Sequence, residues 1–156
     1  MKQDPKLKKV QELMQPGALT AHGFLGADAR NLAAIIDADD AAVARLGVTH
    51  GQIAARMAEL HDAGLEGLGE FVPVAPHFEV RVDSVRGKLP CPFGDRGLEQ
   101  KGFTVVRNSR SGREITYTDL LTHMIEAHGF YEGRGSAFRI EPADLVEALE
   151  IEPSAG

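Results

Sequence analysis

One cysteine and two histidines in the second half of the chain are the residues best suited to chemistry. Cys91 is the only cysteine and lies between two prolines, while His123 and His128 bracket a downstream segment with helical periodicity. A sulfur ligand with two imidazoles begins a zinc site, and a thiolate beside an imidazole also forms the nucleophile and base of cysteine enzymes. The residue types alone leave both chemistries open, together with a third interpretation in which these side chains only pack.

The metal hypothesis assigns Cys91, His123 and His128 as zinc ligands and His77 as the fourth. The two prolines stiffen the loop that carries the sulfur, and His77 lies between Pro76 and the first predicted strand. A tetrahedral zinc site needs four ligands. Other candidates for the fourth position are Asp83, Asp95 and water.

Helix geometry places a condition on this ligand set. His123 and His128 are five residues apart, and five residues of a regular helix rotate by about 140°. Both imidazoles therefore reach one ion only if the helix loosens at its end. Gly129, which follows directly, favours such an ending.

The enzyme hypothesis uses Cys91 as a nucleophile and His123 or His128 as its base. An acidic side chain must then orient the histidine, and Asp119 and Glu126 are available. However, Cys91 does not begin a predicted helix, whose positive end would stabilise a thiolate. This hypothesis predicts rapid alkylation of the cysteine at neutral pH.

A glycine-rich loop with nearby arginines suggests an anion site as a further alternative. Residues 133–136 read Gly-Arg-Gly-Ser, and Arg134 and Arg139 lie in or beside this loop, with Arg113 elsewhere in the chain. Glycine amides and guanidinium groups both suit phosphate oxygens. The segment lacks the lysine and the following helix of a nucleotide-binding loop.

Composition excludes several classes of protein. The 156 residues are 43% hydrophobic and 26% charged, which is typical of a globular chain. A single cysteine excludes an internal disulfide, no export signal is evident, and no apolar run approaches the roughly 20 residues that span a bilayer. We therefore expect a cytoplasmic protein without a membrane segment.

Charge makes nucleic acid a disfavoured partner. The net charge is −6, and only residues 71–140 are mildly basic, with 10 Lys and Arg against 8 Asp and Glu. Phosphate-backbone binding draws much of its affinity from clustered cations. The expected partner is instead another protein or a second copy of this chain, the latter if the N-terminal helix finds no groove of its own.

Residues 1–70 are predicted to be helical. An amphipathic helix over residues 1–15 ends at Pro16 and Gly17, and a second helix runs to Leu46, with Asp28 as its expected cap. A third helix begins at Thr49 and ends at Gly64. The short connection between the second and third helices predicts a helical hairpin.

Residues 42–53 resemble a helix-turn-helix, with glycine at the turn and apolar residues on both sides. In a DNA-binding protein of that kind, the second helix reads base edges. Here that helix offers one arginine, Arg56, opposed by Glu59 and Asp62. A protein-interaction surface on the hairpin is therefore favoured over DNA binding, and it predicts that Cys91→Ser leaves fold and activity unchanged.

Residues 71–151 are predicted to form a small antiparallel sheet with two helices. Apolar residues alternate with polar ones over 78–83, 103–107 and 115–118, and the turn at 108–112 pairs the last two strands. One helix ends at His128 and another begins at Pro142. The whole chain is thus an α+β protein, and residues 152–156 are expected to fray.

The runs 85–93, 123–128 and 129–133 resemble segments of small bacterial proteins to which no activity is assigned. This resemblance implies a stand-alone bacterial cytoplasmic protein and brings no catalytic residues. The leading specific hypothesis is a zinc-binding module with a structural or partner-binding role.

Overall fold

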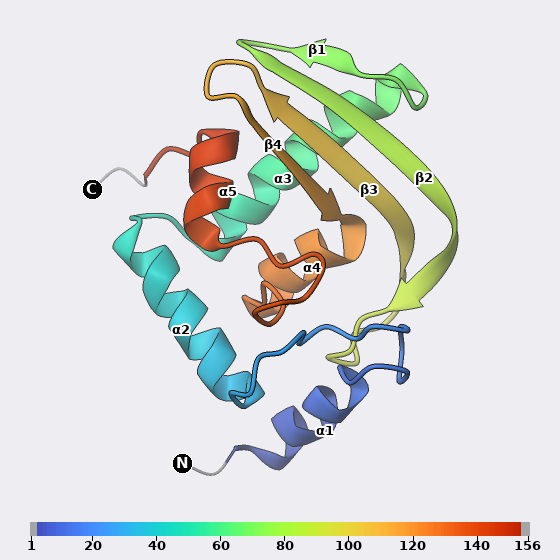
Figure 1. Cartoon of the computed structure of the whole chain (residues 1–156), viewed down its shortest axis with the longest axis vertical. Coiled ribbons are helices and arrows are strands. Elements are labelled where there is room, and N and C mark those ends of the chain that lie inside the picture. The colour runs from blue at the N-terminus through green and yellow to red at the C-terminus, as the bar shows by residue number, and fades with distance from the viewer. Residues whose placement is uncertain (1–2, 154–156) are drawn as a thin grey trace.

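Alternating apolar side chains build a four-stranded antiparallel sheet whose strands follow the chain order (Figure 1). The computed structural model describes residues 3–153. In β2, Phe78, Val80 and Val82 are buried, and the residues between them are more exposed. The strands are β1 (Val72–Val74), β2 (Phe78–Pro90), β3 (Leu98–Asn108) and β4 (Arg113–Thr118).

Five α-helices accompany the sheet within the described residues. They are α1 (Pro5–Leu13), α2 (Leu32–Arg45), α3 (His50–Gly64), α4 (Asp119–His128) and α5 (Pro142–Leu149), with a single 3-10 turn, η1 (Leu65–Gly67). The predicted cap of α3 is confirmed: Thr49 accepts from the Gln52 amide, and the Gln52 side chain accepts from the Thr49 amide. The α+β class is therefore confirmed.

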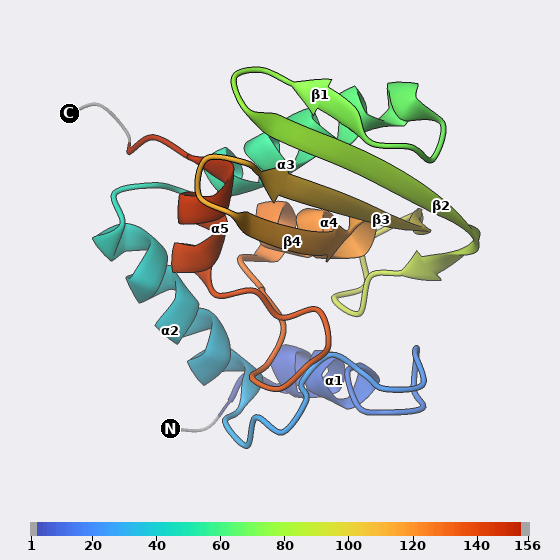
Figure 2. The ribbon, with the colours of Figure 1, turned by 45° about the horizontal axis from the view of Figure 1, so that its top comes forward.

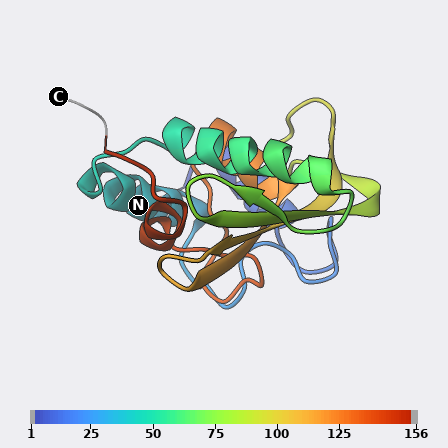
Figure 3. The same cartoon turned by 90° about the horizontal axis from the view of Figure 1, so that it is seen from above.

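Helices α3 and α4 cover one face of the sheet, as Figure 3 shows from above. Gly64 allows close packing, because a Cβ atom there would lie 2.7 Å from Val80. The Tyr117 hydroxyl donates to the Met57 carbonyl across this interface at 2.7 Å. The buried core includes residues from both predicted regions of the chain, the helical one before residue 70 and the α+β one after it.

Two long connecting loops pack against each other. The connection from α1 to α2 and the connection from α4 to α5 run side by side (Figure 2). They are joined by backbone hydrogen bonds from Gly133 to Phe24 at 2.8 Å and from Ala27 to Arg134 at 3.0 Å. These loops line one side of a largely apolar cavity.

The predicted helix over residues 1–15 is found as α1, and its contacts link it to α2. The Gln11 side chain accepts from the Leu32 amide at 3.0 Å, and the Gln3 side chain accepts from the Ala33 amide at 2.8 Å. Free amides at the start of a helix need such acceptors. Helix α1 is thereby held on the start of α2.

The predicted cap of α2 was wrong. Asn31, not Asp28, accepts from the amide of Ala34. The Asp28 carboxylate is instead bound by the Arg30 side chain at 2.6 Å and by the Arg134 amide.

The strands also differ from the sequence expectation. Strands β2 and β3 are longer than predicted and carry a bulge between Val85 and Lys88, and the short β1 was not predicted. The first two residues of the predicted N-terminal helix and residues 154–156 of the predicted frayed tail lie outside the described part of the chain.

Candidate metal centre

The fold brings Cys91, Asp95, His123 and His128 together. Each offers one ligand atom, and these four atoms all lie within 4.8 Å of one another. The cysteine and the aspartate come from the loop between β2 and β3, and both histidines come from α4. A group of this composition and size could hold a metal ion.

The loop that carries Cys91 folds into a tight turn around the sulfur. The Gly94 amide donates to the Cys91 carbonyl at 3.0 Å, and Gly94 has a positive φ of 88° that suits glycine. The amides of Phe93 and Asp95 donate to the sulfur itself. Such hydrogen bonds favour a thiolate, which is the form that binds metal.

Helix α4 presents both histidines without unwinding. It begins at the Thr118 cap and ends regularly at Gly129, whose amide donates to Ile125. The Nε2 atoms of His123 and His128 nevertheless approach the same Asp95 oxygen, at 2.7 and 2.5 Å. The expected loosening of the helix end was therefore wrong: two long side chains converge from either side of a regular helix end.

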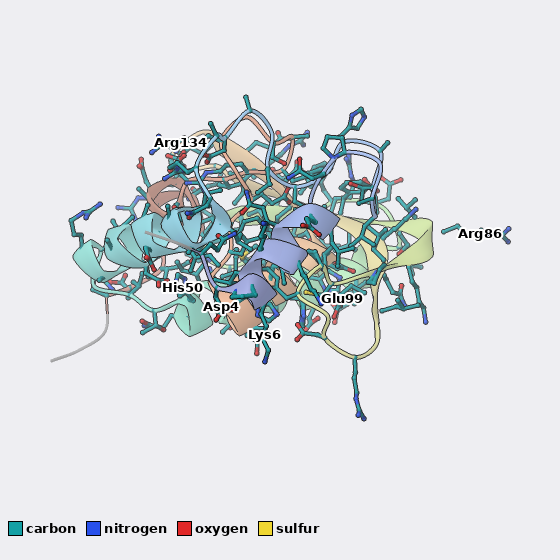
Figure 4. The ribbon with its side chains drawn as sticks, turned by 90° about the horizontal axis from the view of Figure 1, so that it is seen from below. Asp4, Lys6, His50, Arg86, Glu99 and Arg134 are labelled. Carbon is teal, nitrogen blue, oxygen red and sulfur yellow. The ribbon has the colours of Figure 1, made fainter. Side chains whose placement is uncertain are left out.

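Neighbouring side chains fix the orientation of the two imidazoles. The Phe93 ring stacks on His128 with centroids 4.0 Å apart and planes inclined by 10°. Glu99 lies 3.5 Å from Nδ1 of His123, on the side of the ring away from Asp95. Figure 4 shows Glu99 beside the loop between β2 and β3. A carboxylate behind a ligating histidine is common at metal sites.

The pKa values of Cys91 and Asp95, the two acidic groups of the cluster, are shifted in opposite directions. Burial raises the pKa of the Cys91 thiol to about 11, and the neighbouring Asp95 carboxylate adds to the rise. Hydrogen bonds from His128, and then from His123 and Cys91, lower the pKa of Asp95 to about 2. Without a cation, the cluster therefore pairs a protonated thiol with an ionised carboxylate at neutral pH.

His77, the predicted fourth ligand, lies elsewhere. Its Nε2 atom contacts the Glu150 carboxylate at 2.6 Å, and its ring stacks on Phe78. Asp83 is also outside the group and pairs with Arg81. Asp95, one of the alternatives suggested for the fourth ligand, lies in the cluster because the tight turn at Cys91 returns the chain toward α4.

The acidic side chains suggested for a cysteine enzyme do not orient either cluster histidine. Asp119 lies 3.5 Å from His61, and Glu126 is exposed on α4. Glu99 was not considered from the sequence, because nothing local marks it. Its role follows only from the pairing of β2 with β3.

Two of the three arginines suggested for an anion site are paired with carboxylates. Arg139 makes two hydrogen bonds to Asp39 and a further ion pair with Glu141. Arg113 pairs with Asp144 and Glu147 on α5. Arg134 lies at one edge of the molecule in Figure 4. These three side chains therefore do not form one anion cradle.

Side chains at the start of α3 make contacts within the fold. His50 contacts the Tyr131 hydroxyl at 2.7 Å and Asp40 at 2.6 Å. Arg56 donates to the Leu149 carbonyl and pairs with Glu59. The interaction surface expected on this hairpin stays a prediction.

Comparison of the chain with protein-family models, with curated proteins and with solved structures found no match in any of the three. Among the described residues, no helix is long and apolar enough to cross a membrane.

Proposed function

We propose that this chain is a small zinc-binding module in which Cys91, Asp95, His123 and His128 hold the ion in a structural role. The observation that carries the proposal is the convergence of four suitable ligand atoms within 4.8 Å of one another. They come from two segments of the chain that the fold brings together.

The spacing is close to what zinc requires. Zinc bonds of about 2.0–2.3 Å in a tetrahedron separate neighbouring ligand atoms by about 3.3–3.7 Å. The cluster atoms lie between 2.5 and 4.8 Å apart. Side-chain shifts on the order of 1 Å would bring these separations into that range.

The donor set favours zinc over the common hard cations. Calcium and magnesium prefer oxygen ligands, whereas a thiolate and two imidazoles suit zinc and related transition metals. One thiolate and one carboxylate would also balance the charge of a divalent ion. The Cys91 thiol would lose its proton on binding, as metal-bound cysteines do.

Four protein ligands support a structural role over a catalytic one. A catalytic zinc ion keeps a position open for water or substrate, and a structural ion is fully ligated by the protein. Here the ion would cross-link the loop at residues 91–97 to α4. The competing cysteine-enzyme function has less support, because the thiol of the metal-free cluster is protonated at neutral pH.

Cobalt(II) substitution tests this proposal directly. Tetrahedral cobalt bound to a thiolate gives intense visible bands and a sulfur-to-metal charge-transfer band, and zinc should displace it. We expect these spectra from the wild type and the His77→Gln variant. Cys91→Ser should lose the charge-transfer band, and Asp95→Asn should bind at least about tenfold more weakly.

Two results would contradict the proposal. The first is an octahedral cobalt spectrum in the wild-type protein. The second is a loss of cobalt binding in the His77→Gln control that equals the loss in the cluster variants, because His77 lies outside the cluster.

A further inference from the structure

A largely apolar cavity of about 500 Å³ lies beside the β2–β3 hairpin, at residues 85–89 and 100–103. Its other walls include the α1–α2 and α4–α5 loops, at residues 20–26 and 132–138. Its volume is in the range of small-molecule sites. Its apolar walls include two aromatic rings, Phe103 and Phe138, whose centroids lie 5.6 Å apart. Other apolar lining residues are Phe24, Val85, Leu89 and Leu120.

A single buried carboxyl group lines this apolar cavity. Glu132 is only 3% exposed. Its carboxylate accepts a hydrogen bond from the Ser136 hydroxyl at 2.5 Å, the only hydrogen bond to that carboxylate among residues 3–153. A buried acid is costly unless it is paired. The second carboxylate oxygen is therefore available to a ligand.

The backbone holds Glu132 in an unusual conformation. Its φ is +70°, a region that side chains other than glycine seldom adopt. The Arg139 guanidinium fixes it by donating to the Glu132 carbonyl at 2.8 Å. Strained residues that the surrounding structure maintains are concentrated at functional sites.

Close contact between the two loops makes this wall of the cavity rigid. A Cβ atom at Gly133 would lie 2.2 Å from the Leu25 carbonyl oxygen, and one at Gly26 would lie 2.2 Å from the Ser136 nitrogen. Only glycine permits these approaches. The carboxyl group is thus presented by a preformed wall, which suits ligand binding.

From this placement we infer that the cavity binds a small, largely apolar molecule that carries a protonated amine. The amine would donate to the free oxygen of Glu132, and the apolar body would lie against Phe103 and Phe138. This inference is independent of the zinc site, because none of the four cluster residues lines the cavity.

The rim of the cavity presents the opposite charge. Lys101 also lines the cavity, and its side chain is exposed. A ligand acid would meet Lys101 at the rim, where water screens the pair, but would be repelled by the ionised form of the buried Glu132. The buried carboxyl group therefore decides the polarity of the ligand.

Three probes with the same apolar body test the inference. Binding of 4-phenylbutylamine, 4-phenylbutanol and 4-phenylbutyric acid to the full chain is measured by calorimetry, and amide chemical shifts locate the bound probe. We expect the amine to bind about tenfold or more tightly than the alcohol, and the acid most weakly. The shifts should map to residues 132–138 and 100–103.

Two variants make the outcome decisive. Glu132→Gln should remove the preference for the amine while leaving alcohol binding unchanged, and Ala137→Trp should block all three probes by filling the cavity from its exposed rim. If Glu132→Gln fails to fold, the wild-type ranking and shift map still decide. The inference is overturned by an amine that binds no better than the alcohol, by tightest binding of the acid, or by shifts that map elsewhere.

Discussion

The sulfur of Cys91 is buried beside an ionised carboxylate, and this environment controls its reactivity. With its pKa raised to about 11, almost none of the thiol is ionised at pH 7.5 in metal-free protein. We therefore expect iodoacetamide to alkylate Cys91 roughly a hundredfold more slowly than it alkylates glutathione. A rate equal to or above that of glutathione would indicate an activated nucleophile and favour the cysteine-enzyme hypothesis.

Glu132 gives a pH-dependent prediction at the same scale. Burial raises its pKa from 4.5 to about 7, so the folded state holds the proton more tightly than the unfolded state. The stability that this group contributes is present below about pH 4.5 and is lost as pH rises through 7. Glu132→Gln should therefore raise the melting temperature more at pH 8 than at pH 5, measured against wild type. An equal change at both values would contradict the raised pKa.

The sequence identified three of the four residues in the cluster because their types are distinctive. Cysteine and histidine are rare in this chain, whereas Asp95 is one of many acidic residues, and only the turn from Cys91 to Gly94 brings it close. His77 looked equally suitable by type. It lies instead beside Glu150, because Phe78, which follows it, pairs with Asn108 at the end of β3, and Asn108 also donates to Glu150.

At the scale of elements, the proposed ion would join the loop at residues 91–97 to α4. Helix α4 is anchored through buried residues such as Leu121 and Met124, while Leu98, at the start of β3, is exposed. We expect zinc removal to increase amide hydrogen exchange in residues 91–97 and at the end of α4, with α2 unchanged. Uniform exchange changes, or none, would count against a local cross-link.

Some helix ends were predictable from sequence, and strand ends were not. Thr49 and Gly129 are local signals that act within one turn, and as expected Thr49 begins α3 and Gly129 ends α4. The extension of β2 beyond Asp83 depends on its pairing with residues 98–103, a long-range contact. The cap at Asn31 was missed because Asp28 is drawn away by Arg30.

At the scale of the molecule, metal binding should stabilise the fold. A ligand at one hundred times its dissociation constant adds about 2.7 kcal/mol to the free energy of unfolding. For a chain of this size we expect the melting temperature to rise by about 5–10 °C. Calorimetry with and without zinc measures it, and Cys91→Ser should show little rise. An equal rise in that variant would point to binding elsewhere.

The α+β class could be predicted from the change in periodicity near residue 71. The packing of the helical half against the sheet could not be predicted in this way. The core includes Ile53 and Met57 of α3 together with Phe78 and Val80 of β2. Such contacts depend on the angle at which helices cross the sheet. The cavity lined by Glu132 was equally hidden, because its walls come from five separated segments.

The most direct test of the zinc proposal is the metal content of the purified protein. Wild type, Cys91→Ser and His77→Gln are prepared without chelator or metal-affinity resin and measured by mass spectrometry. We predict about one equivalent of zinc in wild type and His77→Gln, and little in Cys91→Ser. No metal in the wild type, even after dialysis against zinc, or equal metal in all three proteins, would contradict the proposal.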